Sequence, residues 1–168
     1  MSDWFQSYGF ADVYDGLVIG AYPLDGDDVR RLTTLSVRHV LNLVEDDEYT
    51  TGQRAVVVQA MDAAGIDEQR LTLVDFGRLP AEQIERAVTM VAEWLDEPGT
   101  VYVHCRAGWQ RSAAVAAGAI AIREGISIDA ALDLVRRRKP SADPLEHQRD
   151  DLRRWMAARS QTHATDEA

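Results

Sequence analysis

The stretch from Thr100 to Ala119, TVYVHCRAGWQRSAAVAAGA, does most to limit the folds open to this chain. Its first residues are β-branched and aromatic, as in a buried strand, and its alanine-rich end has the composition of a tightly packed helix. A short loop from Cys105 to Gln110 joins the two. A strand that leads through a loop into a helix is the unit of a parallel sheet, in which ligands bind beyond the carboxyl ends of the strands.

Strand and helix patterns alternate along the rest of the chain. Strands are predicted at 15–23, 36–44, 70–76 and 100–105, and helices at 25–35, 53–64, 81–97, 111–124, 127–139 and 145–159. Because right-handed crossovers place helices on both faces of such a sheet, we expect an α/β fold with a mostly parallel central sheet flanked by helices, and a helical C-terminal third. The 168 residues suit a single domain, predicted at 1–159, followed by a flexible polar tail at 160–168.

The charge and hydropathy of the chain exclude several classes of partner. Its formal net charge is −10, and the resulting field repels nucleic acid and anionic membranes. No apolar run approaches the about 20 residues that span a bilayer. The opening residues MSDWFQSYGF lack the basic flank and apolar core of a signal peptide. We therefore expect a cytoplasmic protein with no nucleic-acid or membrane partner, and a monomer as the default state.

Cys105 is the only cysteine, which excludes an intramolecular disulfide and a multi-cysteine zinc site. It is either an inert core thiol or a reactive one. The loop N–H groups can converge at the N-terminus of the helix at 111–124 and bind an oxyanion, while Arg111 adds a planar two-pronged contact. The same surroundings lower a thiol pKa from about 8.5 to about 3.5–7.5. The sequence thus predicts a thiolate facing a phosphate group held by Arg106, Ala107, Gly108, Trp109, Gln110 and Arg111.

The residues around this loop have more than one interpretation. Ser112 can donate a hydrogen bond to the sulfur or serve only as an N-terminal helix residue. We expect His104 to order the loop backbone from behind as a structural hydrogen-bonding residue. Trp109 packs against either the substrate or the protein. The basic cluster at 136–139 is interpreted as offsetting a helix dipole, and the acidic run at 45–48 as a solvated loop.

The segment HCRAGWQRS matches the HCx5R(S/T) signature of the cysteine-dependent protein tyrosine phosphatases. The compact dual-specificity branch is the closer resemblance, because GLVIGAYP, HVLNL, LVDFGRLP and ALDLVRRRKPSADPLEHQRDDLRRW resemble its opening strand, second strand, general-acid loop and closing helices. The likeness runs from Asp15 to Trp155. It departs from the family at Gln110, where a glycine is most common, and at Trp109, which is large for a loop rim.

This resemblance implies a protein tyrosine phosphatase-like fold and a two-step hydrolysis that needs no metal or cofactor. Cys105 would attack phosphorus while Asp75 protonates the departing oxygen, and Asp75 would then activate the water that hydrolyses the cysteinyl-phosphate. Asp75 ends a predicted strand and precedes a loop that can close over a substrate. A turn carboxylate is the alternative role for it, and Asp62 and Asp67 are weaker candidates for the acid.

The substrate expected from the resemblance is a phosphorylated protein or a small phosphomonoester. Only Arg106 adds a positive charge inside the loop, which favours phosphotyrosine, with phosphoserine and phosphothreonine as further candidates, over a polyphosphorylated lipid. The alternatives are a phosphoinositide or other small-molecule phosphatase of the same superfamily, a rhodanese-type sulfurtransferase, and an inactive phosphate-binding module. Removal of RNA 5′ phosphates is disfavoured by the acidic net charge.

Overall fold

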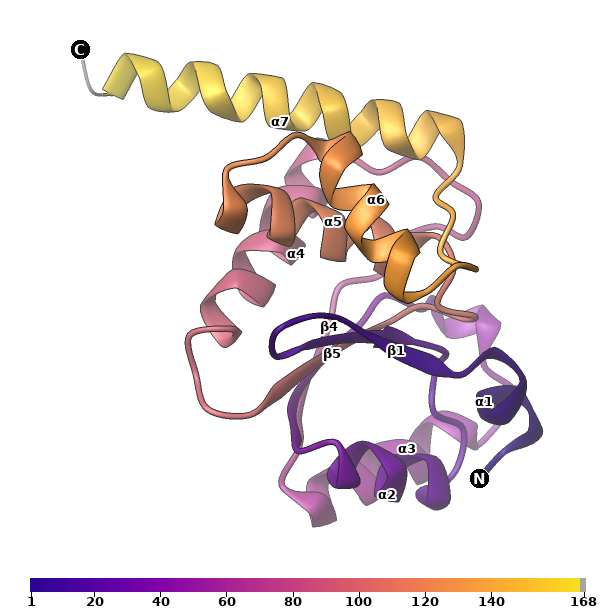
Figure 1. The fold of residues 1–168 in the computed structure, drawn as a ribbon. Coiled ribbons are helices and arrows are strands. Elements are labelled where there is room, and N and C mark those ends of the chain that lie inside the picture. Colours follow the sequence, from indigo (N-terminus) through magenta and orange to yellow (C-terminus); the bar gives the residue numbers. More distant parts are fainter. Residues whose placement is uncertain (167–168) are drawn as a thin grey trace.

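A five-stranded sheet runs through the middle of the molecule, with helices on both of its faces (Figure 1). The computed structural model describes residues 1–166. Four strands are parallel, and the first is antiparallel to its neighbour at one edge. Their order across the sheet is β1 (Phe10–Tyr14), β2 (Leu17–Gly20), β5 (Thr100–His104), β3 (Val37–Asn42) and β4 (Asp67–Arg70). The predicted α/β class with a mostly parallel sheet is confirmed.

The side chains of the central strand β5 divide the core into two layers. Val101 and Val103 point to one face, and Tyr102 points to the other, as the two-residue period of a strand requires. The helices on the Val101 side are α4 (Ala81–Trp94), α5 (Arg111–Glu124), α6 (Ile128–Arg138) and α7 (Glu146–Asp166). Those on the Tyr102 side are α1 (Asp3–Tyr8), α2 (Gly26–Thr34) and α3 (Gln53–Ala64).

Small residues let α5 be covered on all sides. Every residue from Arg111 to Ala121 is buried, and a Cβ atom added to Gly118 would lie 2.7 Å from a methyl group of Val88 on α4. The helix therefore packs directly against the sheet and three other helices, and its N-terminus is held rigidly beyond the carboxyl end of β5. Among the described residues, no helix has the length and hydropathy needed to cross a membrane.

Several helix boundaries fall where the sequence places them. α3 and α5 begin and end at the predicted residues, and each is followed by a glycine in the left-handed region, Gly65 at φ 66° and Gly125 at φ 64°. Ser127 caps α6 by accepting a hydrogen bond from the Ala130 N–H. At the C-terminus, α7 continues to Asp166, whereas the predicted helix ended at Arg159. Residues 160–166 of the predicted tail thus have helical backbone, and 167–168 lie outside the described residues.

Strand β4 begins and ends earlier in the sequence than the strand predicted in this part of the chain. The apolar pattern placed it at 70–76, but β4 covers Asp67–Arg70. The apolar residues Leu71 and Leu73 follow the strand, are buried, and donate N–H groups to the carbonyls of Asn42 and Leu43 at 3.0 Å. They anchor the segment that leads to Asp75. The short elements α1 and β1 were not predicted, because six and five residues are too few to show a clear period.

Candidate active site

Cys105 directly follows β5, and the loop that it opens is packed against β2. The thiol is 3% exposed, and its Sγ lies 3.4 Å from the hydroxyl of Ser112. Gly108 adopts φ 74°, and a Cβ atom at this position would lie 2.6 Å from the backbone carbonyl carbon of Gly20. The loop can approach β2 this closely because Gly108 has no side chain.

The surroundings of Cys105 favour its thiolate. Burial is the largest influence and raises the thiol pKa. The charge of Arg111 and the hydrogen bonds from the Ser112 side chain and the Ser112 and Gln110 backbone act in the opposite direction. Together they outweigh burial, so the pKa of Cys105 is lowered from its ordinary value. This fits the predicted nucleophile and the first of the two interpretations of Ser112.

Arg111 is the most completely enclosed charge in the site, with 1% of its side chain exposed. Its two terminal nitrogens each donate to one carboxylate oxygen of Glu48 at 2.7 Å. Nη1 also donates to the Leu73 carbonyl at 2.9 Å, and Nη2 lies 3.1 Å from Oδ1 of Asp75. Its Nε has no hydrogen-bond partner among the described residues, which leaves one donor for a bound oxyanion.

The interpretation of residues 45–48 as a solvated loop is wrong for Glu48. Its side chain is only 8% exposed because it forms the ion pair with Arg111. The carboxylate of Glu45, in the same turn, accepts the backbone N–H of Asp75 at 3.2 Å. A signal was present in the sequence: a buried arginine needs a carboxylate, and this acidic run follows β3 at the sheet edge where Cys105 lies.

The structure brings Asp75 into the same cavity as Cys105. Its side chain is 27% exposed and faces Arg111. The weaker candidates Asp62 and Asp67 lie in α3 and β4 and do not line this cavity. The geometry thus places one carboxyl group, from the predicted acid loop, beside the thiol and the arginine.

A cavity of about 320 Å³ opens above the loop at 105–110, which we call the thiol loop. Its polar lining comes from Asp75 and the loop itself, and four aromatic side chains form its walls: Trp4, Tyr8, Phe76 and Trp109. A larger depression of about 820 Å³ lies between the turn after β1 and α6, and it contains none of the thiol-loop residues. The walls of the smaller cavity suit a flat apolar group.

Two of the aromatic walls come from α1 and were not predicted. The indole N–H of Trp4 donates to the carbonyl of Arg106 at 2.8 Å, and the Arg106 guanidinium lies 5.1 Å from the Trp4 ring centroid. The Tyr8 ring lies 5.2 Å from that of Trp109, which is 42% exposed. Trp109 therefore both packs against the protein and lines the cavity. Trp4 and Tyr8 have the i,i+4 spacing of a helix face, but so short a helix gave no signal.

His104 lies beneath the loop and is fully buried. Burial, the dominant influence, lowers its pKa to about 3, while a backbone interaction at Cys105 acts in the other direction. Its ring nitrogens have no partner at good hydrogen-bond geometry among the described residues. The neutral ring packs 5.9 Å from that of Tyr102, and its interaction with the Cys105 backbone is the contact through which His104 would order the loop, so that role stays a prediction.

The sequence profile described as "Dual specificity phosphatase, catalytic domain" matches residues 19–158. The chain belongs to the dual specificity phosphatase family. Its curated relatives include phosphatidylglycerophosphatase and protein-tyrosine phosphatase 1 of Mus musculus, 28% identical over 116 residues, 68% of this chain and 56% of the relative. The Homo sapiens protein of the same name is 28% identical over 116 residues, 68% of this chain and 54% of its own length. The chain thus spans about half the length of these relatives.

Solved structures of the family share the fold. A crystal structure of PTPMT1 superimposes with a TM-score of 0.80 at 22% identity, covering 94% of this chain and 99% of that one. Tk-PTP in its active form gives a TM-score of 0.76 at 22% identity, covering 87% of this chain and 95% of that one. The structure of PTPMT1 in complex with PI(5)P gives a TM-score of 0.76 at 23% identity, covering 90% of this chain and 98% of that one. The likeness reaches well beyond the thiol loop to the order and packing of the whole domain.

Proposed function

We propose that this dual specificity phosphatase-family protein hydrolyses aryl phosphate monoesters, phosphotyrosine first, through a cysteinyl-phosphate intermediate. One observation carries the proposal: a thiol with a lowered pKa lies with Arg111 and Asp75 at the base of a cavity walled by aromatic side chains. Asp75 distinguishes the site from that of a sulfurtransferase, which needs no acid. The intact thiol, arginine and carboxyl group speak against an inactive binding module.

The chemistry follows from these positions. The Cys105 thiolate forms a sulfur–phosphorus bond as the bond between phosphorus and the aryl oxygen breaks, and the Asp75 carboxylic acid gives its proton to that oxygen. Water then attacks phosphorus, its proton passes to the Asp75 carboxylate, and the sulfur leaves as a thiolate. The Ser112 hydroxyl, 3.4 Å from Sγ, stabilises the sulfur anion in this second step. The charge of Arg111 and its unpartnered Nε–H stabilise the phosphoryl group throughout.

The cavity walls support an aryl substrate. A phosphotyrosyl ring fits between aromatic side chains, whereas a phosphoserine methylene would leave the about 320 Å³ cavity largely unfilled. Arg106 is the only added cation in the loop, and its guanidinium lies over Trp4. This leaves little positive charge for a second phosphate group.

A phosphorylated lipid headgroup or another small phosphomonoester is the second candidate. The matched curated relatives are named as phosphatidylglycerophosphatases as well as protein-tyrosine phosphatases, and one structural neighbour was solved with PI(5)P. The exposed side chains of Phe76 and Trp109, which line the cavity, would suit an apolar tail.

A substrate panel tests the proposal. Phosphotyrosyl, phosphoseryl and phosphothreonyl peptides are compared with phosphatidylglycerophosphate and a phosphoinositide, using the wild type and Cys105→Ser. We expect the highest kcat/KM on phosphotyrosyl peptides and no turnover by the serine variant at an unchanged melting temperature. A higher kcat/KM on either lipid would establish the second candidate, and turnover by Cys105→Ser would exclude the covalent route.

A further inference from the structure

The segment that follows Asp75 is held by one helix, α7. Gln148 is fully buried, and its Nε2 donates to the Gly77 carbonyl at 3.0 Å. Asp151, one turn further along, is 8% exposed and accepts the Leu79 N–H at 2.9 Å. These contacts have opposite polarity, one to a carbonyl and one to an N–H. They hold the backbone immediately before and after Arg78, in a segment that belongs to no helix or strand.

Further contacts reinforce this arrangement. The Nε2 atom of His147 lies 3.1 Å from the carbonyls of both Phe76 and Gly77. Asp151 also accepts from Nη1 of Arg78 at 2.9 Å. Phe76 itself has a positive φ of 55°, which is unfavourable for an aromatic residue. A strained turn of this kind persists only where its surroundings hold it, and here α7 supplies the surroundings.

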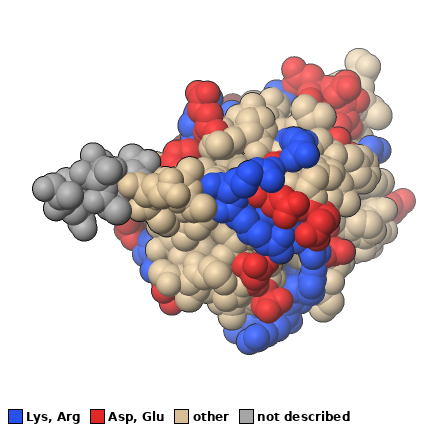
Figure 2. Space-filling model, turned by 90° about the horizontal axis from the view of Figure 1, so that it is seen from above, with Lys and Arg blue, Asp and Glu red and all other residues tan. Residues whose placement is uncertain are grey.

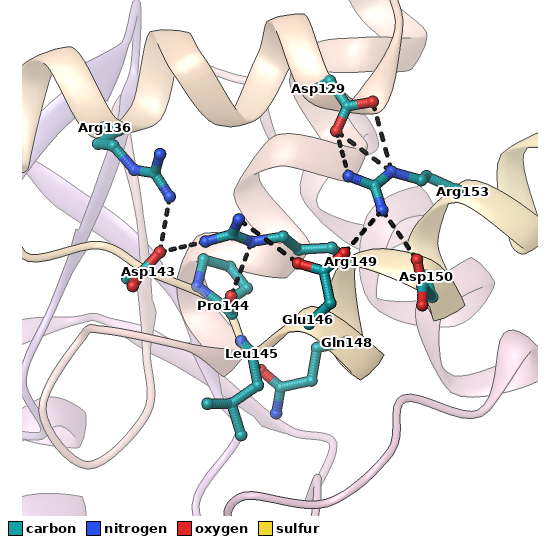
Figure 3. Close-up of polar contacts among 10 residues, drawn as sticks. All are labelled: Asp129, Arg136, Asp143, Pro144, Leu145, Glu146, Gln148, Arg149, Asp150 and Arg153. Atoms are coloured by element: carbon teal, nitrogen blue, oxygen red, sulfur yellow. Dashed lines mark hydrogen bonds and ion pairs between the residues drawn. The ribbon is translucent and has the colours of Figure 1, made fainter.

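The start of α7 is fixed to α6 by a ladder of charges (Figure 3). Asp143, in the connection between the two helices, pairs with Arg136 and Arg149. Arg153 pairs with Asp129 of α6 at 2.7 Å. Figure 2, which looks down on the molecule from above the view of Figure 1, shows a band of basic side chains with acidic side chains set among them.

Gln148 points away from the ladder in Figure 3. One side of α7 is therefore anchored through ion pairs to α6 and its connection, while Gln148 reaches the segment after Asp75. Movement of this helix would be passed to the backbone directly adjoining Asp75.

We propose that the first turns of α7 are a clamp that sets the position of Asp75, with Gln148 and Asp151 as positioning residues for proton delivery. The inference rests on the proposed function, because it requires Asp75 to be the acid. A displacement of about 1 Å at a reacting group can cost about 100-fold in rate. The thiol directly follows β5 and Arg111 begins α5, so loosening the clamp should impair proton transfer and leave the nucleophile intact.

This division of labour gives a measurable signature in the leaving group. The p-nitrophenolate ion leaves readily without a proton, whereas the oxygen of phenyl phosphate needs one. A positioned acid contributes about 100- to 10,000-fold, so we expect partial misplacement to lower kcat/KM on phenyl phosphate about tenfold, because kcat/KM reports only the steps up to cysteinyl-phosphate formation. The same variant should hydrolyse p-nitrophenyl phosphate within about twofold of the wild-type kcat/KM. A general loss of packing would lower both rates together.

The informative variants are Gln148→Glu and Asp151→Leu. A glutamate can still accept the Leu145 N–H but, when ionised, cannot donate to Gly77. Leucine removes the acceptor for Leu79. Asp150→Asn is the matched control, because Asp150 pairs with Arg153 of the same helix. In the Asp75→Ala background, Gln148→Glu should cause no further loss on phenyl phosphate, since the group that it positions is gone.

Hydrogen–deuterium exchange of the amides at 77–79 reports on the clamp without any substrate. We expect faster exchange there in both variants and wild-type exchange in Asp150→Asn. Unchanged exchange would overturn the clamp, and faster exchange with equal losses on the two substrates would overturn its positioning role. If the wild type were inert on every aryl phosphate, the proposed function and the positioning role would both fail, and exchange would still decide whether α7 holds the loop.

Discussion

Glu48 and Arg111, 63 residues apart in the chain, form a two-pronged ion pair in which each carboxylate oxygen accepts a guanidinium N–H at 2.7 Å. Their side chains are 8% and 1% exposed. The pair fixes the plane of the guanidinium next to the thiol before any phosphate binds. It also joins the turn after β3 to the start of α5, so the acidic turn is part of the site.

Glu48→Gln should impair both phosphate binding and folding. The amide can accept only one of the two N–H groups, which leaves a buried charge incompletely paired and should lower the free energy of unfolding by about 2–3 kcal/mol. A misaligned Arg111 should reduce kcat/KM on p-nitrophenyl phosphate by up to about 100-fold. Asp47→Asn, an exposed change in the same turn, is the control and should match the wild type in both measurements.

The same pair makes stability depend on pH. Burial raises the pKa of Glu48, but the hydrogen bonds from Arg111 and the Glu45 backbone outweigh it, so the folded-state pKa is lowered. The contribution of Glu48 to stability is therefore complete above its unfolded-state pKa of about 4.3. This contribution is lost as the pH falls through the lower folded-state pKa. In urea unfolding, the difference in free energy of unfolding between wild type and Glu48→Gln should be constant above about pH 5. This difference should become smaller below about pH 4. A difference of equal size throughout would rule out the ionised pair as its cause.

The lowered pKa of Cys105 can be measured directly by alkylation. Only the thiolate reacts with iodoacetamide, so the pH midpoint of inactivation should lie below the ordinary thiol value of about 8.5. Ser112→Ala removes one of the hydrogen bonds that stabilise the anion and should move the midpoint upward. It should also slow breakdown of the cysteinyl-phosphate, so that the phosphoenzyme accumulates in rapid-quench experiments. A midpoint at or above the ordinary value in the wild type would contradict the assignment of the nucleophile.

Sequence reasoning brings candidate residues to one cavity where each is fixed by its neighbours in the chain. Cys105 and Arg111 belong to one strand–loop–helix unit, whose composition determines both the loop and the helix boundary. Glu48 and Trp4 reach the site from separate elements. The acidic run after β3 was a signal for Glu48, but only tertiary packing shows that a short N-terminal helix meets the thiol loop. The strand predicted at 70–76 shows a further limit, because an apolar alternation can mark a buried extended segment as well as a strand.

The aromatic wall from α1 should determine preference for the substrate ring. Trp4→Ala and Tyr8→Ala each remove one side of the cavity and should raise KM for a phosphotyrosyl peptide about three- to tenfold, the value of one aromatic contact. The rate of Cys105 alkylation should change little, since neither side chain is among the main influences on the thiol. Ser7→Ala, an exposed position on the same helix, is the control. An unchanged KM in both aromatic variants would exclude the wall from substrate recognition.

Gly108 and Gly65 offer a matched test of how tightly the thiol loop is packed. Both have positive φ, 74° and 66°, so alanine imposes a similar conformational cost of about 1 kcal/mol at each. They differ in their surroundings: a Cβ at Gly65 meets no atom within 4 Å, whereas one at Gly108 lies 2.6 Å from the backbone of Gly20. Gly65→Ala should therefore keep full activity with a small loss of stability. Gly108→Ala must displace the loop from β2, and we expect kcat/KM to fall more than about 100-fold because the loop amides lose their alignment with the phosphate. Equal kcat/KM values for the two alanine variants would show that the loop does not need this close contact with β2.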